Sequence, residues 1–161
     1  MTDSTSKTVQ NDSRHPVKRG DLSSSFHKAG MRLTRQRLAI YRELRGRYDH
    51  PDVDTLFRAV KPRIPQISLF TVYRTMNALE AAGMVWRVAT FKGHARYDGN
   101  IDTHSHFLCE TCGKIDDVAG DAAGSIGVLS GMPGTVRRVE VMISGECAAC
   151  TAARVSAAQQ A

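Results

Sequence analysis

Apolar side chains recur at spacings of three and four residues in four stretches of the first half of the chain, the pattern of amphipathic helices. Ser, Thr or Asp precedes three of these stretches, as helix N-caps do, and glycine follows three of them, as at helix ends. The predicted helices cover residues 22–29, a stretch between Thr34 and Gly46, a stretch from Asp52 or Asp54 to Val60, and residues 69–82.

The predicted helix over residues 69–82 has two different faces. One face is apolar and is expected to pack on the core; its residues are Leu69, Val72, Met76 and Leu79. The other face carries side chains that suit contacts with DNA bases and phosphates. These are Phe70, Thr71, Arg74 and Asn77, with Tyr73 at the edge. The pattern alone also fits an ordinary solvated helix face.

After the helices, two strands are expected over residues 84–91 and 94–98, joined by Lys92 and Gly93. Helices followed by a basic hairpin predict a winged helix-turn-helix over residues 22–98. Lys92 at the hairpin tip is then placed to contact a phosphate.

The second half of the chain predicts strands around residues 104–109, 114–118 and 136–143. Five glycines between residues 120 and 134 weaken a helix that we place over 121–130, and the segment after Cys150 is helical or loose. The predicted fold class is α+β: a disordered tail over 1–21, a winged helix-turn-helix over 22–98 and a small α/β, zinc-stapled dimerisation domain over 99–161.

Charge is divided unevenly along the chain of 161 residues. Residues 1–97 hold 18 Lys and Arg against 8 Asp and Glu, whereas residues 98–161 hold 4 against 8. A basic first part predicts a polyanionic partner, which favours double-stranded DNA over a merely solvated helix face. No apolar run approaches the roughly 18 residues of a membrane span, and no apolar signal core is evident, so we expect no membrane and a cytoplasmic protein.

All four cysteines lie in two C-x-x-C pairs, Cys109 with Cys112 and Cys147 with Cys150. Two such pairs predict a tetrahedral zinc site, because each pair bends tightly enough to place two thiolates on one ion. Two disulfides or four unrelated thiols are the alternative, which the absence of an export signal disfavours. Four thiolates leave no open coordination position, so the predicted zinc is structural.

His104 and His106 flank a single serine just before the first cysteine pair. In a strand, residues two apart point to the same face, so both imidazoles reach one ion. That ion is not the zinc, whose four positions are filled. A second metal site is therefore predicted, with Asp98, Asp102, Asp116 and Asp117 as candidate carboxylates; two solvated surface histidines are the alternative.

These motifs resemble the ferric uptake regulator family of bacterial metal-dependent repressors. The resemblance is carried by residues 31–37, by Ser68 and residues 71–74, and by the histidine and cysteine motifs from His104 to Cys150. It implies a winged-helix domain, a hinge, and a homodimer that binds palindromic, usually AT-rich operators when its regulatory metal is bound. The candidate DNA contacts are Arg32, Phe70, Thr71, Tyr73, Arg74, Asn77 and Lys92. Phe70 departs from the small residue common at its position in the family.

The resemblance also implies a ligand set for the regulatory metal: His50, Asp98, His104, His106 and Asp117. Three imidazoles and two carboxylates suit Fe²⁺ or Mn²⁺ and also bind Zn²⁺. Asp at both carboxylate positions resembles the peroxide-responsive members, in which bound Fe²⁺ leads to oxidation of a histidine ligand. By position, that histidine is His50 or His104.

Two alternatives to a peroxide sensor stay open. A repressor of the same family that senses the level of iron or zinc has the same kind of ligand set. A non-haem iron enzyme uses two histidines and a carboxylate, but it leaves the DNA-reading helix unexplained. We therefore predict a regulator and not an enzyme.

Overall fold

The computed structural model describes residues 19–118, 134–135 and 139–159. Its contacts divide the described residues into two compact units, with the boundary between Asp102 and Thr103. The first unit is mainly helical, and the second contains a three-stranded sheet. The α+β class predicted from the sequence is confirmed. The predicted tail over 1–21 lies almost entirely outside the described residues.

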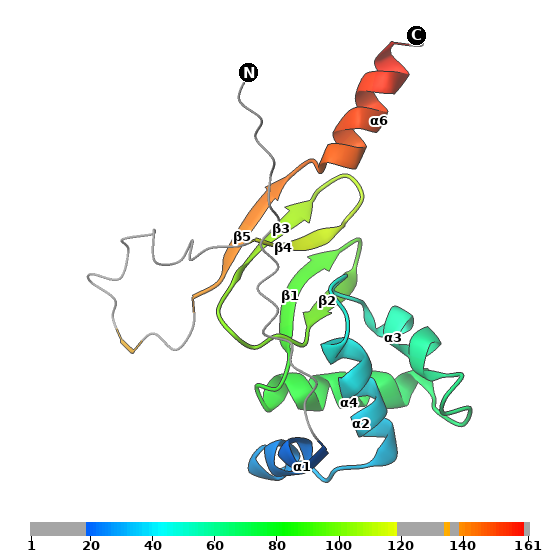
Figure 1. Cartoon of the computed structure of the whole chain (residues 1–161), viewed down its shortest axis with the longest axis vertical. Helices are drawn as coiled ribbons and strands as arrows, with labels where there is room; N and C mark the ends of the chain where they lie inside the picture. The colour runs from blue at the N-terminus through cyan, green and yellow to red at the C-terminus, as the bar shows by residue number, and fades with distance from the viewer. Residues whose placement is uncertain (1–18, 119–133, 136–138, 160–161) are drawn as a thin grey trace. The chain divides into compact units, whose positions relative to one another are not determined.

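Four helices form the body of the first unit (Figure 1). They are α1 (Arg19–Lys28), α2 (Arg35–Arg45), α3 (Val53–Val60) and α4 (Leu69–Ala81). The helix α1 begins three residues before the predicted start at residue 22, and the other three begin directly after their predicted N-caps. Polar side chains ahead of an apolar repeat therefore fixed three of the four starts.

The three N-caps each accept a backbone hydrogen bond from the first turn of their helix. Thr34 accepts from the Arg37 N–H at 3.2 Å, and Ser68 accepts from the Thr71 N–H at 3.1 Å. Asp52 caps α3 by accepting from the Thr55 N–H at 2.8 Å, which decides between the two predicted aspartates. Such a cap contributes about 1 kcal/mol to stability.

The core of the first unit contains the apolar face of α4. Val72, Met76 and Leu79 are fully buried, whereas Leu69 is only partly buried at the edge of the core. Buried side chains from the other helices complete this core, including Phe26, Ile40, Leu44, Leu56 and Val60. All four members of the predicted stripe therefore face the core, three of them fully buried.

A β-hairpin follows α4, formed by β1 (Trp86–Phe91) and β2 (His94–Asp98) in antiparallel register. The strand β1 begins two residues later than predicted, because the Met84 N–H donates a hydrogen bond to the Leu79 carbonyl of α4 and pairing with β2 begins only at Trp86. Lys92 and Gly93 have φ angles of 48° and 82°. Two positive φ angles are typical of a type I′ turn, whose twist matches that of the paired strands.

The second unit contains β3 (Ser105–Cys109), β4 (Ile115–Val118), β5 (Val141–Gly145) and α6 (Ala148–Ala158). The strand order is β4-β3-β5, with β4 antiparallel and β5 parallel to β3. The predicted strand over 136–143 is confirmed at residues 141–143, and β5 continues to Gly145; residues 139–140 precede the strand, and residues 136–138 lie outside the described residues. The predicted helix over 121–130 lies outside the described residues, and the segment after Cys150 is helical.

Within the described ranges, no helix combines the length and the apolar character that crossing a bilayer requires.

Candidate functional sites

The four cysteine sulfurs gather in the second unit. Cys109 Sγ lies 3.9 Å from Cys150 Sγ, and Cys112 Sγ lies 3.9 Å from Cys147 Sγ. A disulfide requires about 2.05 Å, so all four thiols are free. Zinc–sulfur bonds of about 2.3 Å in a tetrahedron place sulfurs about 3.8 Å apart. The residues present therefore fit a zinc ion bound by four thiolates.

Two tight backbone turns bring these sulfurs together. The first pair lies where β3 ends, in a turn closed by the Gly113 N–H donating to the Cys109 carbonyl at 2.8 Å. Gly113 has a φ of 75°, a conformation that glycine adopts without strain. The second pair lies at the start of α6, where Cys147 is the N-cap residue. The positive end of a helix dipole stabilises thiolates at that position.

Backbone groups also prepare one thiol for metal. Hydrogen bonds from the backbone N–H groups of Cys112 and Cys147 lower the pKa of Cys109 to about 6. Hydrogen bonds with the sulfurs of Cys147 and Cys112 raise the pKa of Cys150 to about 12. Metal binding to the cluster therefore has to displace a proton from Cys150, so we expect zinc affinity to rise with pH.

The first unit contains a buried imidazole–carboxylate pair, His50 with Asp98. His50 Nε2 lies 3.7 Å from Asp98 Oδ2, and each residue is only 2% exposed. His50 lies in the loop before α3, and Asp98 is the last residue of β2. The other oxygen, Oδ1, accepts a hydrogen bond from the Asn100 N–H at 2.8 Å. That bond leaves Oδ2 directed toward the imidazole.

The second unit contains a separate group of two imidazoles and a carboxylate. His106 lies in β3 and His104 directly precedes that strand, and their rings have centroids 4.4 Å apart, so the two imidazoles lie together as predicted. Asp117 Oδ1 lies 3.5 Å from His104 Nε2 and 3.8 Å from His106 Nε2. The β3–β4 register pairs His106 directly with Asp117. Asp116, by contrast, bonds Lys114 at 2.8 Å.

A third group of potential ligands lies near the start of α3, and sequence reasoning did not single it out. His94 Nδ1 is 3.9 Å from Asp52 Oδ2 and 4.0 Å from Asp54 Oδ2. Both aspartates lie at the positive end of the α3 dipole, where carboxylates stabilise a helix. Helix capping therefore accounts for the pair of carboxylates without a metal.

The predicted DNA-reading face of α4 is exposed. Phe70 and Tyr73 are 69% and 42% exposed, which is unusual for aromatic side chains. The guanidinium of Arg74 lies over the Phe70 ring, 5.8 Å from its centroid. Asn77 is also exposed, whereas Thr71 is partly buried and its hydroxyl lies 2.8 Å from that of Ser68. Arg32 and Lys92 are exposed on the same unit.

Sequence reasoning missed Arg96, although this residue contacts a predicted ligand. Its guanidinium donates hydrogen bonds to the backbone carbonyls of Asp49 and His50. A lone arginine in a strand gives no sequence signal for such a contact, because the partner carbonyls lie 46 and 47 residues away in the chain.

Together, a helical unit with a β-hairpin and a sheet unit with four gathered thiols define a winged-helix protein with a tetrathiolate metal centre. The chain belongs to the ferric uptake regulator family, whose model matches residues 28–126.

The chain is similar to two curated relatives over part of their length. It is 38% identical over 94 residues to the peroxide-responsive repressor PerR of Staphylococcus epidermidis, which covers 58% of this chain and 63% of that protein. It is 40% identical over 106 residues to the ferric uptake regulation protein 1 of Mycolicibacterium fortuitum, covering 63% and 65%. The matches thus span somewhat less than two thirds of each relative.

Among solved structures, the fold is similar to that of the Helicobacter pylori ferric uptake regulator Fur, with a TM-score of 0.68. That match covers 82% of this chain and 90% of the other, at 22% identity.

Proposed function

We propose that this chain is a metal-dependent transcriptional repressor that binds palindromic operator DNA as a homodimer. Its regulatory metal is Fe²⁺ or Mn²⁺, and peroxide relieves repression. Membership of the ferric uptake regulator family and the similarity to a relative named as a peroxide-responsive repressor support this assignment.

The observation that carries the proposal is that each unit holds its own part of the predicted ligand set in a compact arrangement. The first unit contributes His50 and Asp98, and the second contributes His104, His106 and Asp117. One ion bound by both groups would couple the DNA-reading unit to the sheet unit. The donor set of three nitrogens and two carboxylate oxygens suits Fe²⁺ and Mn²⁺.

Iron, when bound, would supply the redox chemistry by which hydrogen peroxide transfers one oxygen atom to a neighbouring imidazole carbon, while the other oxygen leaves as water. The side chain that receives the oxygen atom is that of either His50 or His104. An oxidised imidazole is a poorer ligand, so the five-residue set then loses one of its donors. The two units lose their shared ion as a result, and the repressor leaves its operator.

For DNA binding, α4 is the recognition helix, and the contacts come from Arg32, Phe70, Thr71, Tyr73, Arg74, Asn77 and Lys92. In a dimer, two such helices enter successive major grooves of a palindrome.

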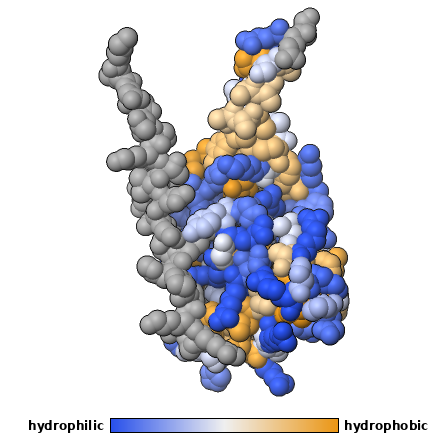
Figure 2. Space-filling view, turned by 45° about the vertical axis from the view of Figure 1, so that its right-hand side comes forward, coloured by the Kyte–Doolittle hydropathy of each residue, from blue (hydrophilic) through white to orange (hydrophobic). Residues whose placement is uncertain are grey.

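The second unit is the dimerisation unit in this proposal. Apolar residues gather along α6 on the face shown in Figure 2, and α6 has no buried residues within the chain. Met142, Ile143 and Val155 are 37%, 41% and 44% exposed. Structural zinc bound by the four cysteines stabilises this unit. We also propose that the protein acts in the cytoplasm.

The second candidate function is sensing of the iron or zinc level without peroxide chemistry. The similarity to the ferric uptake regulation protein of Mycolicibacterium fortuitum favours it, because the identity to that relative is equally high. These relatives are named as regulators and not as enzymes.

A gel shift on an AT-rich palindrome separates the candidates. Protein loaded with Mn²⁺ or Fe²⁺ is tested with and without micromolar peroxide, and the peptides are then weighed by mass spectrometry. Release in the iron sample alone, with one added oxygen on the peptide containing His50 or His104, supports peroxide sensing. Binding that follows the metal level and ignores peroxide supports the second candidate, and metal-independent behaviour contradicts both.

A further inference from the structure

Three consecutive backbone carbonyl groups in the loop before α3 accept hydrogen bonds from residues of β2. Arg96 Nε donates a hydrogen bond to the His50 carbonyl, and its Nη2 donates to the Asp49 carbonyl at 2.6 Å. The N–H of the next residue, Tyr97, donates to the Pro51 carbonyl at 3.1 Å. Two adjacent residues of one strand therefore fix the path of the loop that carries His50.

His50 needs this support because its backbone is in an unfavourable conformation. Its φ angle is 47°, in the left-handed region that residues other than glycine rarely occupy. It also precedes Pro51, and the residue before a proline normally adopts an extended conformation. The surrounding hydrogen bonds must therefore hold His50 in place.

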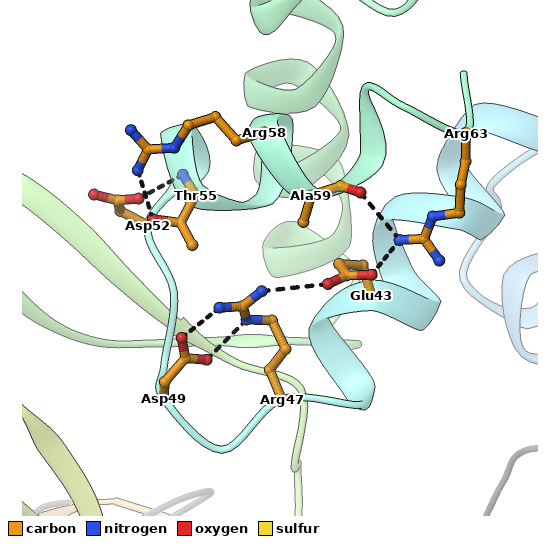
Figure 3. A network of polar contacts seen from close by, with 8 residues as sticks. All are labelled: Glu43, Arg47, Asp49, Asp52, Thr55, Arg58, Ala59 and Arg63. Carbon is orange, nitrogen blue, oxygen red and sulfur yellow. Dashed lines mark hydrogen bonds and ion pairs between the residues drawn. The ribbon is translucent and has the colours of Figure 1, made fainter. Parts of the chain in front are cut away.

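The loop is also held from the side of α2. Asp49 receives two hydrogen bonds from the Arg47 guanidinium, the one from Nε at 2.8 Å. Arg47 in turn bonds Glu43 at 3.3 Å, and Glu43 also pairs with Arg63 (Figure 3). Glu43 lies within α2, so this network supports the loop before His50, while Arg96 supports it from β2.

We propose that Arg96 is a positioning residue for the metal-binding imidazole of His50. Its guanidinium fixes the loop so that His50 Nε2 lies beside Asp98 Oδ2 before an ion binds. Arginine suits this task because its planar group donates to two carbonyls at once, whereas lysine offers a single point charge. This inference rests on the proposed function, since it concerns one part of the same five-residue ligand set.

The test compares metal binding by variants of the full, zinc-containing chain. Titration with Mn²⁺ gives the affinity of the regulatory site, and the visible absorption of bound Co²⁺ reports its geometry. Removing a group that supports a metal ligand weakens metal binding about 10–100-fold. Arg96→Gln is therefore expected to weaken Mn²⁺ binding at least about tenfold and to alter the Co²⁺ spectrum, with Arg96→Lys in between.

Arg87→Gln is the matched control. Arg87 lies on the neighbouring strand β1 and bonds Glu80 at 2.8 Å. Its loss should leave Mn²⁺ affinity and the Co²⁺ spectrum unchanged. A thermal unfolding midpoint of Arg96→Gln close to that of Arg87→Gln shows that the lost affinity is not a general loss of fold.

The outcomes distinguish this inference from the proposed function. If His50→Ala abolishes Mn²⁺ binding while Arg96→Gln keeps wild-type affinity and spectrum, the positioning role is wrong and the function stands. If the wild-type chain binds no Mn²⁺ beside its zinc, or if His50→Ala binds Mn²⁺ as tightly as the wild type, the proposed function is wrong, and the inference that rests on it is wrong as well. Should Arg96→Gln not fold, Arg96→Lys decides: a folded lysine variant with wild-type affinity and spectrum overturns the inference.

Discussion

The two units keep their structure by different means. The first unit encloses a continuous core in which side chains from four helices and the hairpin are buried. In the described part of the second unit, the buried apolar side chains are those of Cys109 and Ile115. These described residues bury little apolar surface, and small domains with little buried apolar surface generally depend on metals, disulfides or partner chains. We infer that apolar packing stabilises the first unit and that zinc stabilises the second.

Breaking the tetrathiolate site should have the largest effect, and only in the second unit. Cys112→Ser removes one of four ligands, and structural zinc in small domains contributes about 10–16 kcal/mol of apparent binding free energy. We expect loss of zinc and unfolding of the second unit, with helices α1 to α4 of the first unit retained. Zinc analysis and circular dichroism measure this.

Two results bear on that expectation. Thr111→Ser, a change in the same turn at a residue that is not a ligand, should retain zinc. A Cys112→Ser protein that lacks zinc yet melts like the wild type would contradict the division between the two units.

Truncating the core of the first unit should reverse the pattern. Met76→Ala removes a fully buried side chain from α4 and is expected to destabilise the first unit by about 2–5 kcal/mol. Chemical denaturation followed by circular dichroism measures the loss, while zinc content should stay constant. Phe70→Ala, at an exposed position of the same helix, is the control and should cost far less. Loss of zinc from Met76→Ala would show that the units are not independent.

The N-cap of α3, Asp52, should make the stability of the first unit depend on pH. Partial burial alone would raise the pKa of Asp52, but hydrogen bonds from Thr55 outweigh it, and the pKa is lowered. A lowered pKa in the folded state stabilises the protein above the unfolded value of about 3.9, and this contribution is lost as pH falls through the folded pKa. Asp52→Ala should therefore cost about 1 kcal/mol near pH 7 and less in acid.

Asp52→Asn is the matched variant, because an asparagine side chain still caps the helix but does not titrate in this range. Its stability near pH 7 should approach that of the wild type, with a weaker dependence on pH below about 4. Equal acid sensitivity of the wild type and Asp52→Asn, measured by denaturation at several pH values, would remove Asp52 as a source of that dependence.

The sequence predicted best where one physical rule acts locally. Thr34, Asp52 and Ser68 marked helix starts because a capping side chain bonds within its own first turn. The two-residue period placed His104 and His106 together for a similarly local reason. The predicted start of β1 was wrong because it depends on the partner strand: β2 ends at Asp98, which pairs with Trp86, so pairing cannot begin earlier.

The same distinction applies to the candidate sites. The choice of Asp117 over Asp116 as the partner of His104 came from family resemblance, and the β3–β4 register supplies its physical reason. The contact of Arg96 with His50 had no local signal and emerged only from the tertiary structure. Groupings of residues close in the chain, such as the two histidines, could therefore be predicted from the sequence. The long-range hydrogen bonds that hold the His50 loop could not.

The parallel pairing of β3 with β5 has a consequence for the order of folding. The two cysteine pairs are separated by 34 residues, so joining them requires closure of a long loop. The entropy of that closure costs about 3 kcal/mol. The turn that holds Cys109 and Cys112 closes over only a few residues and requires no such step. On a growing chain this first pair is completed before the second, so we expect it to bind zinc first and the long loop to close later around that ion.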